Sequence, residues 1–306
     1  MRWNFFGSNG LRAGWRLLRF VVLVVAVLAA LRAVLERAVP AGMQLGLHRL
    51  ADGVADPVEL GAFEAAVLAA ILLATAISAM LERRGFASYG LPWRLLLGRQ
   101  FWTGALWGFA AISAVVAVLL LCGAARVVGV RHGVPVAWDA LLWSAVAIVI
   151  GLAEESTFRG YLQATLASGI GFWPAAAVIS LIFAGYHVTN AGESPIGLAS
   201  IVVFGLFFCL ALRRTGNLWW PIGFHAAWDW GQSFFYGVAD SGLSASRNLL
   251  TTVPDGPSWL SGGGVGPEAS ILCPVVLLAC GAALVGRRGP VARAGERAAA
   301  PTPKTF

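Results

Sequence analysis

Residues 141–160 read LLWSAVAIVIGLAEESTFRG, and they join an uncharged stretch to three charged side chains, Glu154, Glu155 and Arg159. The chain around them has 306 residues, of which 58% are hydrophobic and 12% charged, and its mean hydropathy is +0.75. A water-soluble domain carries far more polar surface than this composition provides. The sequence therefore predicts an all-α, polytopic integral membrane protein in which these three charges need a specific role.

Runs of mainly apolar residues recur along the chain. About 20 such residues suffice for a helix to cross a hydrocarbon core of roughly 30 Å. We expect eight transmembrane helices, over residues 17–36, 60–82, 102–123, 143–168, 172–190, 195–213, 217–238 and 269–286. The first run follows Arg12, Arg16 and Arg19 as a secretion signal would, but it is long and lacks a convincing small-residue cleavage site. We interpret it as a retained helix.

Basic residues are distributed unevenly between the two sides of such a bundle. With eight crossings, the tails and loops on the side of the termini hold fifteen of the 22 basic residues, and those on the other side hold five. Because loops rich in Lys and Arg stay in the cytoplasm, we expect both termini to be cytoplasmic. The net charge of +7 then reflects orientation and contact with membrane lipid, with no nucleic-acid partner.

Five ionisable side chains lie deep in the expected helices: Glu154, Glu155, His187, His225 and Asp229. Burying such a group in a bilayer costs at least about 2.5–3.5 kcal/mol, so each needs a partner or a function. At about 1.5 Å per helical residue, Glu154 and His187 lie at similar distances from the turn at 169–171. We expect them to face each other at one depth, and His225 matches that depth if the turn protrudes into the cytosol.

Residues four apart share one face of a helix. Three such pairs occur here: Glu155 with Arg159, Phe183 with His187, and His225 with Asp229. Arg159 can therefore neutralise Glu155, whereas Glu154 lies about 100° around the helix and is left to face a cavity. We interpret Glu155, Arg159 and Phe183 as supporting residues.

A carboxylate and two imidazoles in a confined wet pocket suit peptide hydrolysis. Glu154 could act as a general base on water oriented by His187, and His225 could stabilise the tetrahedral intermediate. Asp229 would hold the tautomer of His225 or contact a ligand of a bound metal ion. Glu154, His187 and His225 could instead hold a zinc ion with one open position, although the helix-borne HExxH signature is absent. Metal-free and zinc-assisted chemistry both remain open.

Three short motifs carry a family resemblance. EESTFR (154–159), FAGYH (183–187) and HAAWD (225–229) resemble the ordered EExxxR, FxxxH and Hxxx(N/D) motifs of the CPBP family. This family comprises the CAAX prenyl endopeptidases of the Ras-converting type and their Abi-like bacterial relatives, and the likeness covers roughly residues 100–240. It implies an eight-helix fold around a cytoplasm-facing catalytic cavity, in a bacterial cell (inner) membrane.

The resemblance also implies a function. It predicts endopeptidase activity on a membrane-associated or lipid-anchored peptide or protein, with Glu154 and His187 activating water. His225 and Asp229 would stabilise the oxyanion. The similar eukaryotic prenyl-protein proteases have Asn at the position that matches Asp229.

Four regions follow from these assignments. We expect an N-terminal region with two transmembrane helices (1–100), a catalytic helical core (101–240), a long outer loop with the last transmembrane helix (241–286), and a flexible basic cytoplasmic tail (287–306). The outer loop, residues 239–268, is rich in Gly, Ser and Pro, and we expect it to be flexible as well.

Two other classes of function compete with hydrolysis. A proton-coupled transporter would also bury carboxylates and histidines, but the repeated halves or broken helices typical of transporters are not visible. A non-catalytic immunity or scaffold protein would keep the fold and would not need the base at Glu154.

Overall fold

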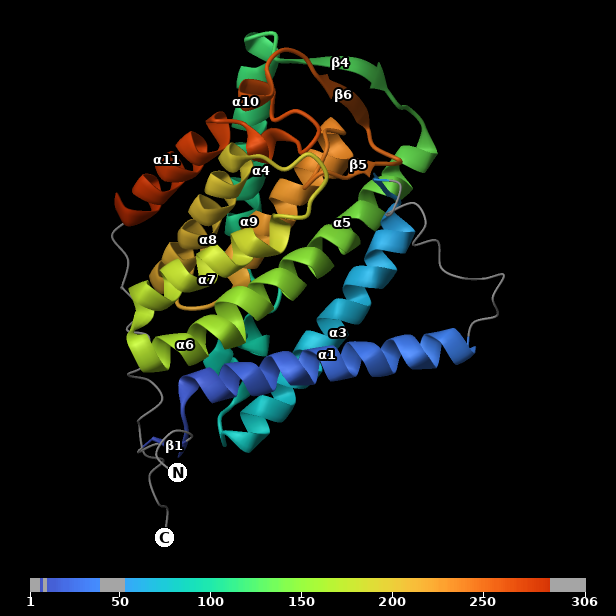
Figure 1. The fold of residues 1–306 in the computed structure, drawn as a ribbon. Coiled ribbons are helices and arrows are strands. Elements are labelled where there is room, and N and C mark those ends of the chain that lie inside the picture. The colour runs from blue at the N-terminus through green and yellow to red at the C-terminus, as the bar shows by residue number, and fades with distance from the viewer. Residues whose placement is uncertain (1–5, 8–9, 39–52, 287–306) are drawn as a thin grey trace.

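The computed structural model describes residues 6–7, 10–38 and 53–286. Within them the chain forms a mostly helical bundle with short strands at its two ends (Figure 1). The helices are α1 (Ala13–Ala38), α3 (Pro57–Leu81), α4 (Arg99–Leu121), α5 (Val134–Glu155), α6 (Gln163–Ile170), α7 (Phe172–His187), α8 (Pro195–Thr215), α9 (Trp219–Trp230), α10 (Ser258–Ser261) and α11 (Leu272–Gly286). The predicted flexible tail at 287–306 lies outside the described residues.

Local sequence signals set the ends of two helices that wall the bundle. At α3, Pro57 occupies the first turn and the Asp56 side chain accepts a hydrogen bond from the backbone N–H of Val58 at 3.0 Å. At α8, Ser194 caps the backbone N–H of Gly197 at 3.0 Å, and Gly216 ends the helix with φ at 80°. A capping side chain satisfies an otherwise unpaired N–H, and glycine tolerates this left-handed conformation.

Glycines bring α4 and α9 into close contact. A Cβ added at Gly104 would lie 2.1 Å from the carbonyl oxygen of Trp220, and one at Gly108 would lie 2.0 Å from that of Phe224. On the α9 side, a Cβ at Gly223 would lie 2.1 Å from the carbonyl oxygen of Phe101. Small residues four apart let membrane helices approach closely, so this packing fixes the position of α9 and of the polar residues it carries.

Two π-helical segments begin just after the polar residues of α5 and α9, which are Glu154 and Glu155 on α5 and His225 and Asp229 on α9. Ser156–Leu162 joins α5 to α6, so that Val134–Ile170 forms one helical span, and Gly231–Tyr236 extends α9. Single π-helical turns are rare and occur often at functional sites. Both segments therefore point to the part of the bundle where α5 and α9 meet.

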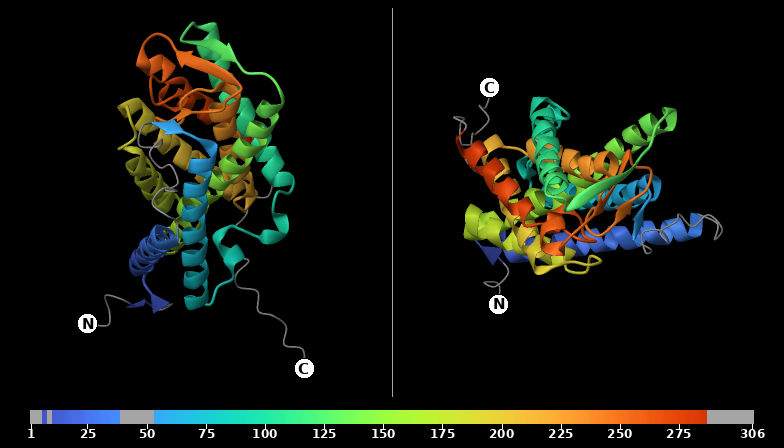
Figure 2. Two further views of the ribbon diagram at one scale, coloured as in Figure 1. Left: turned by 90° about the vertical axis from the view of Figure 1, so that its right-hand side faces the viewer. Right: turned by 90° about the horizontal axis from the view of Figure 1, so that it is seen from above.

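Helix α1 lies across the lower part of the bundle, against α3 and α6, and most of its surface is exposed (Figure 1, Figure 2). Glu82, just after α3, binds it through Arg16 and through Arg19 at 2.6 Å, and also accepts hydrogen bonds from Tyr89 and Tyr161. Burial alone would raise the pKa of Glu82, but the hydrogen bonds from Arg16 and the two tyrosines lower it below its usual value. The carboxylate thus ties three segments of the chain together.

The opposite end of the bundle carries a folded cap. Strand β4 (Ala125–Val130) pairs antiparallel with β6 (Leu250–Pro254), and β3 (Val54–Ala55) pairs parallel with β5 (Ser244–Ala245). The ring nitrogen of Trp143 on α5 donates to the backbone of Ser246 at 3.1 Å. The expectation of a flexible outer loop is therefore wrong over these residues, because the loop is paired in two small sheets and bound to the bundle.

The expected helical fold is confirmed, and the expected number of crossings is only partly tested. Each of the eight apolar runs contains a helix, but five helices are long and apolar enough to span a membrane by themselves among the described residues. Helices α7 and α11 are apolar but shorter, and α9 reaches a comparable length only with its π-helical extension. Eight crossings and the division into four regions remain predictions.

Candidate active site

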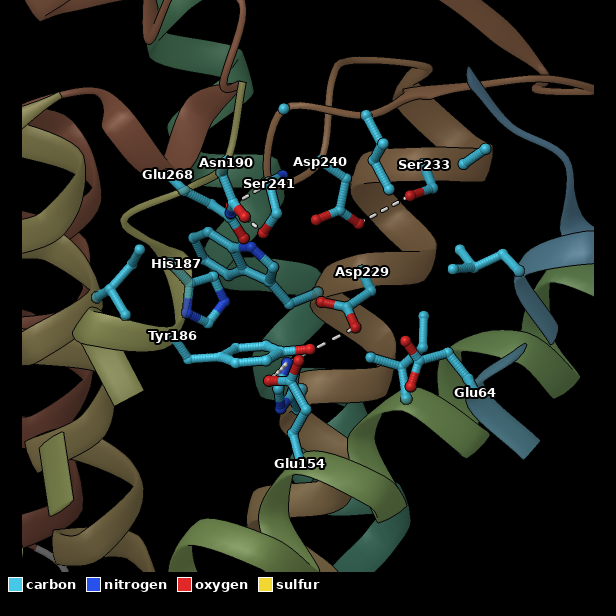
Figure 3. Close-up of a pocket in the computed structure, with 18 of the residues that line it drawn as sticks. Glu64, Glu154, Tyr186, His187, Asn190, Asp229, Ser233, Asp240, Ser241 and Glu268 are labelled. Carbon is cyan, nitrogen blue, oxygen red and sulfur yellow. Dashed lines mark hydrogen bonds and ion pairs between the residues drawn. The ribbon is translucent and has the colours of Figure 1, made fainter. Parts of the chain in front are cut away.

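A pocket of about 750 Å³ lies between α3, α5, α7, α8 and α9, under the cap (Figure 3). Its lining includes all four of the residues expected to be catalytic: Glu154, His187, His225 and Asp229. They come from three different helices, so the structure brings together side chains that are up to 75 positions apart in the sequence.

His225 lies among three carboxylates. Its Nε2 is 3.7 Å from Glu154 Oε2 and also 3.7 Å from Asp229 Oδ2. The side chains of Glu154 and His225 keep exposed fractions of 20% and 12%, whereas Asp229 is more deeply buried at 8%. Nε2 of His225 and the Glu154 carboxylate therefore both remain accessible to water or a ligand in the pocket.

The third carboxylate holds the other ring nitrogen of His225. Nδ1 lies 3.1 Å from Glu155 Oε1, and the same oxygen accepts a hydrogen bond from Arg159 at 3.0 Å. The expectation that Asp229 alone sets the tautomer of His225 needs correction, because Asp229 faces Nε2 whereas Glu155 binds Nδ1. Glu155 thus connects a buried ion pair to the pocket and orients the imidazole.

Arg159 is surrounded by aromatic rings. Its guanidinium carbon lies 4.3 Å from the ring centre of Phe183 and 5.2 Å from that of Phe208. Phe183 also packs edge-on against His187, with ring centres 4.7 Å apart. Phe183 therefore contacts both the buried guanidinium of Arg159 and the pocket residue His187, in agreement with a supporting role.

His187 has a defined tautomer. Its Nδ1 lies 2.8 Å from the carbonyl oxygen of Phe183, and a carbonyl can only accept a hydrogen bond. Nδ1 therefore carries the proton, which leaves the lone pair of a neutral ring on Nε2. His187 is buried, with 7% of its surface exposed, and ends α7 where the chain enters the loop to α8.

Residues 136–231 match the family model described as type II CAAX prenyl endopeptidase Rce1-like. This match confirms the resemblance seen in the three motifs, all of which lie inside the matched segment. It supports a peptidase of the CAAX type in general terms, and the several apolar helices support an integral membrane protein. A search of curated proteins found no match to this chain.

Three further carboxylates line the pocket from outside the Rce1-like segment. They are Glu64 on α3, Asp240 after α9, and Glu268 before α11 (Figure 3). Ser233 donates to Asp240 at 2.8 Å, and the hydroxyl of Ser241 donates to Glu268 at 3.1 Å. Burial raises the pKa of Asp240 to about 6 and that of Glu268 to about 8, and the mutual repulsion of the two groups contributes to the rise at Glu268.

The sequence contains a usable signal for one of these three residues. Glu64 lies inside the apolar run at 60–82, where an acid needs an explanation, although its position near the start of that run favours a place at a span end. In the structure Glu64 lies in the second turn of α3, close to the start of the helix, and it also lines the pocket. Asp240 and Glu268 lie in loops, and helical periodicity does not predict where loop residues lie relative to the helices.

A bound zinc ion does not fit this arrangement. Among the described residues, no group of three or more His, Cys, Asp or Glu side chains has the geometry of a metal site. The proposed set of Glu154, His187 and His225 is thus present in one pocket without being arranged as ligands of a single ion.

Proposed function

We propose that this protein is an intramembrane endopeptidase that hydrolyses a peptide bond in a membrane-associated or lipid-anchored substrate. One observation carries the proposal: Glu154, His187 and His225, from three helices of the Rce1-like segment, line a single pocket together. The pocket, at about 750 Å³, has the size of a typical ligand site.

Glu154 is the proposed general base. Its carboxylate is partly accessible in a pocket lined by both apolar and polar side chains, where a water molecule would be confined beside it. The Nε2 lone pair of His187 is a second acceptor for the same water, fixed by the hydrogen bond on Nδ1. Two acceptors for the hydrogens of one water orient it, so that a lone pair on its oxygen attacks the carbonyl carbon while Glu154 takes one proton.

His225 is the proposed stabiliser of the tetrahedral intermediate. In its doubly protonated form, Nδ1–H donates to Glu155 and Nε2–H is free to donate to the oxyanion. Glu154 then returns a proton to the leaving amine, which completes hydrolysis without a covalent intermediate. Asp229 lies on the same side as Nε2 and would hold that proton in the resting state.

The pocket's charge restricts the substrate. Five lining side chains are carboxylates, and none of the described lining residues is Lys or Arg. A peptide that ends in a free carboxylate close to the scissile bond would meet repulsion from Asp240, whose pKa is about 6, whereas Glu268, with its pKa raised to about 8, is largely protonated near neutral pH. We therefore propose that the bound segment is neutral or basic, which disfavours a short C-terminal fragment with its carboxylate in the pocket.

The deciding experiment compares protein N-termini in membranes that contain the wild type or Glu154→Gln at equal expression. Glu59→Gln, an identical change on α3 at a residue that does not line the pocket, is the control. We expect a set of N-termini that depends on Glu154 and not on Glu59, with or without a chelator.

Three results would contradict parts of this proposal. Unchanged N-termini with retained biological activity would favour a scaffold. Solute flux in liposomes that survives His225→Ala would favour a transporter. Loss of cleavage with chelator alone would show that a metal ion is required after all.

A further inference from the structure

The pocket belongs to one end of the bundle. Its lining includes residues from four connecting segments: 53–55, 189–191, 240–243 and residue 268. All four lie at the end that carries the β3–β5 and β4–β6 pairs, shown at the top of Figure 1. Among the residues lining the pocket, none comes from the segments at the other end, 82–98, 169–171 or 214–218. Access from an aqueous phase is therefore through the capped end.

The basic residues belong to the other end. The α1 start, the α3–α4 segment and the end of α8 hold nine described arginines: Arg12, Arg16, Arg19, Arg83, Arg84, Arg94, Arg99, Arg213 and Arg214. The capped end holds three in the described loops, and each pairs with an acid: Arg126 with Asp255, Arg131 with Asp139, and Arg247 with Asp56. The two ends thus differ strongly in basic charge.

This difference decides which end faces the cytoplasm. The positive-inside rule counts Lys and Arg in short loops next to the membrane, and nine against three is a clear asymmetry, which holds even when Arg32 and Arg37 near the end of α1 are counted with the three. It places the arginine-rich end in the cytoplasm and the capped end on the opposite side. The expectations of cytoplasmic termini and of a cytoplasm-facing cavity therefore cannot both hold in this fold.

We propose that the active-site pocket opens to the non-cytoplasmic side of the membrane, and that the substrate is a peptide segment presented on that side. The part of this inference that concerns the substrate rests on the proposed peptidase function. The orientation of the pocket does not, because it follows from charge and pocket position alone. It names a class of substrate: the extracytoplasmic segment of a membrane-anchored protein.

The side wall of the pocket agrees with a membrane-anchored substrate. Phe63 on α3 and Tyr186 on α7 both line the pocket, and they keep 44% and 61% of their surfaces exposed. In a bilayer, exposed aromatic side chains on transmembrane helices contact lipid or its interface. A tethered segment can therefore approach between α3 and α7 from the leaflet at the capped end.

Thiol labelling in intact cells tests the orientation without any need for cleavage. The exposed native Cys122 is first changed to Ser, because it lies near the capped end, whereas Cys209 and Cys273 are buried. Asp255→Cys then places an exposed thiol at the capped end, and Arg84→Cys places one at the arginine-rich end. We expect a membrane-impermeant maleimide to label Asp255→Cys in intact cells as fully as after permeabilisation.

Arg84→Cys should be labelled only after permeabilisation. The reverse pattern would overturn the proposal. Repeating both measurements in a Glu154→Gln background separates this question from catalysis, since orientation should not change when the base is removed.

The same membranes give a second, independent readout. The N-termini that depend on Glu154 should map to extracytoplasmic segments of anchored proteins. If labelling supports the outward orientation while no such N-termini exist, the peptidase function fails and the orientation stands. Glu154-dependent cleavage within cytoplasmic segments would instead refute the outward-facing site and keep the peptidase.

Discussion

Replacing either Glu155 or Arg159 alone should destabilise the protein strongly, whereas replacing both together should not. Both side chains are fully buried, with the Nη1 to Oε1 distance at 3.0 Å. Arg159→Met removes the cation and keeps most of the side-chain volume, so the main effect is a buried carboxylate whose remaining partner is His225. Removing one partner of a buried ion pair typically costs about 3–5 kcal/mol. Loss of the aromatic contacts around the guanidinium adds roughly 0.5–2 kcal/mol.

The double variant Glu155→Gln/Arg159→Met should recover most of that loss. The side chain introduced at position 155 is not charged, and its amide oxygen can still accept from His225 Nδ1. Arg159 Nε and Nη2 have no hydrogen-bond partner among the described residues, so the native pair is already incompletely satisfied. A fully buried pair of this kind can be replaced by neutral groups at little cost, and we expect the double variant within about 1–2 kcal/mol of the wild type.

The assay is the free energy of unfolding in mixed micelles for the wild type, both single variants and the double variant. From the values above, the double variant should be more stable than Arg159→Met by about 2–5 kcal/mol. Cleavage gives a separate readout, because the double variant is stable yet lacks the charged acceptor that orients His225. Its kcat should fall about 10- to 100-fold. The reasoning is refuted if Arg159→Met costs under about 1 kcal/mol, or if the double variant is as unstable as that single one.

Three other predictions address packing, pH and substrate charge. Gly108→Ala should destabilise the protein by about 1–3 kcal/mol and reduce cleavage, because its Cβ would overlap Phe224 on α9. Gly185→Ala on α7 is the control, because no atom lies within 4 Å of the new Cβ, and it should be neutral or slightly stabilising. Thermal unfolding of both variants measures the difference. The raised pKa of Glu268, about 8, means that the folded state binds its proton more tightly than the unfolded state. Its contribution to stability is therefore complete below the unfolded pKa, near 4.5, and is lost as the pH rises through 8. Glu268→Gln should flatten the fall in Tm between pH 5 and pH 8, and an unchanged slope would contradict this assignment. Finally, once a cleaved peptide is known, its C-terminally amidated form should be a better substrate than the free acid, and Glu64→Gln should narrow the difference in kcat/KM.

Periodicity along single helices predicted the centre of the site and missed how its parts connect. The i,i+4 rule correctly paired Glu155 with Arg159, because that contact lies within one helical segment. It assigned the tautomer of His225 to Asp229 for the same reason. The hydrogen bond from His225 to Glu155 crosses from α9 to α5, and its formation depends on how closely these two helices approach each other. No spacing within one segment encodes that approach, although Gly151 on α5 permits it, since a Cβ there would lie 3.1 Å from the carbonyl oxygen of Ile222 on α9.

Three of the five acidic side chains in the pocket come from segments for which the sequence predicts no part in the site. Asp240 and Glu268 lie on either side of β5 and β6, and they meet only because the outer loop folds back over α9. The Rce1-like segment ends before both of them and begins after Glu64. The matched segment therefore supplies Glu154, His187, His225 and Asp229, while the surrounding chain supplies the further acidic walls and the cap. Since these walls contact whatever occupies the pocket, we expect differences in substrate between this protein and Rce1-like peptidases to arise from residues 53–64 and 239–268. Exchanging those segments should change which peptides are cut and leave the dependence on Glu154 intact.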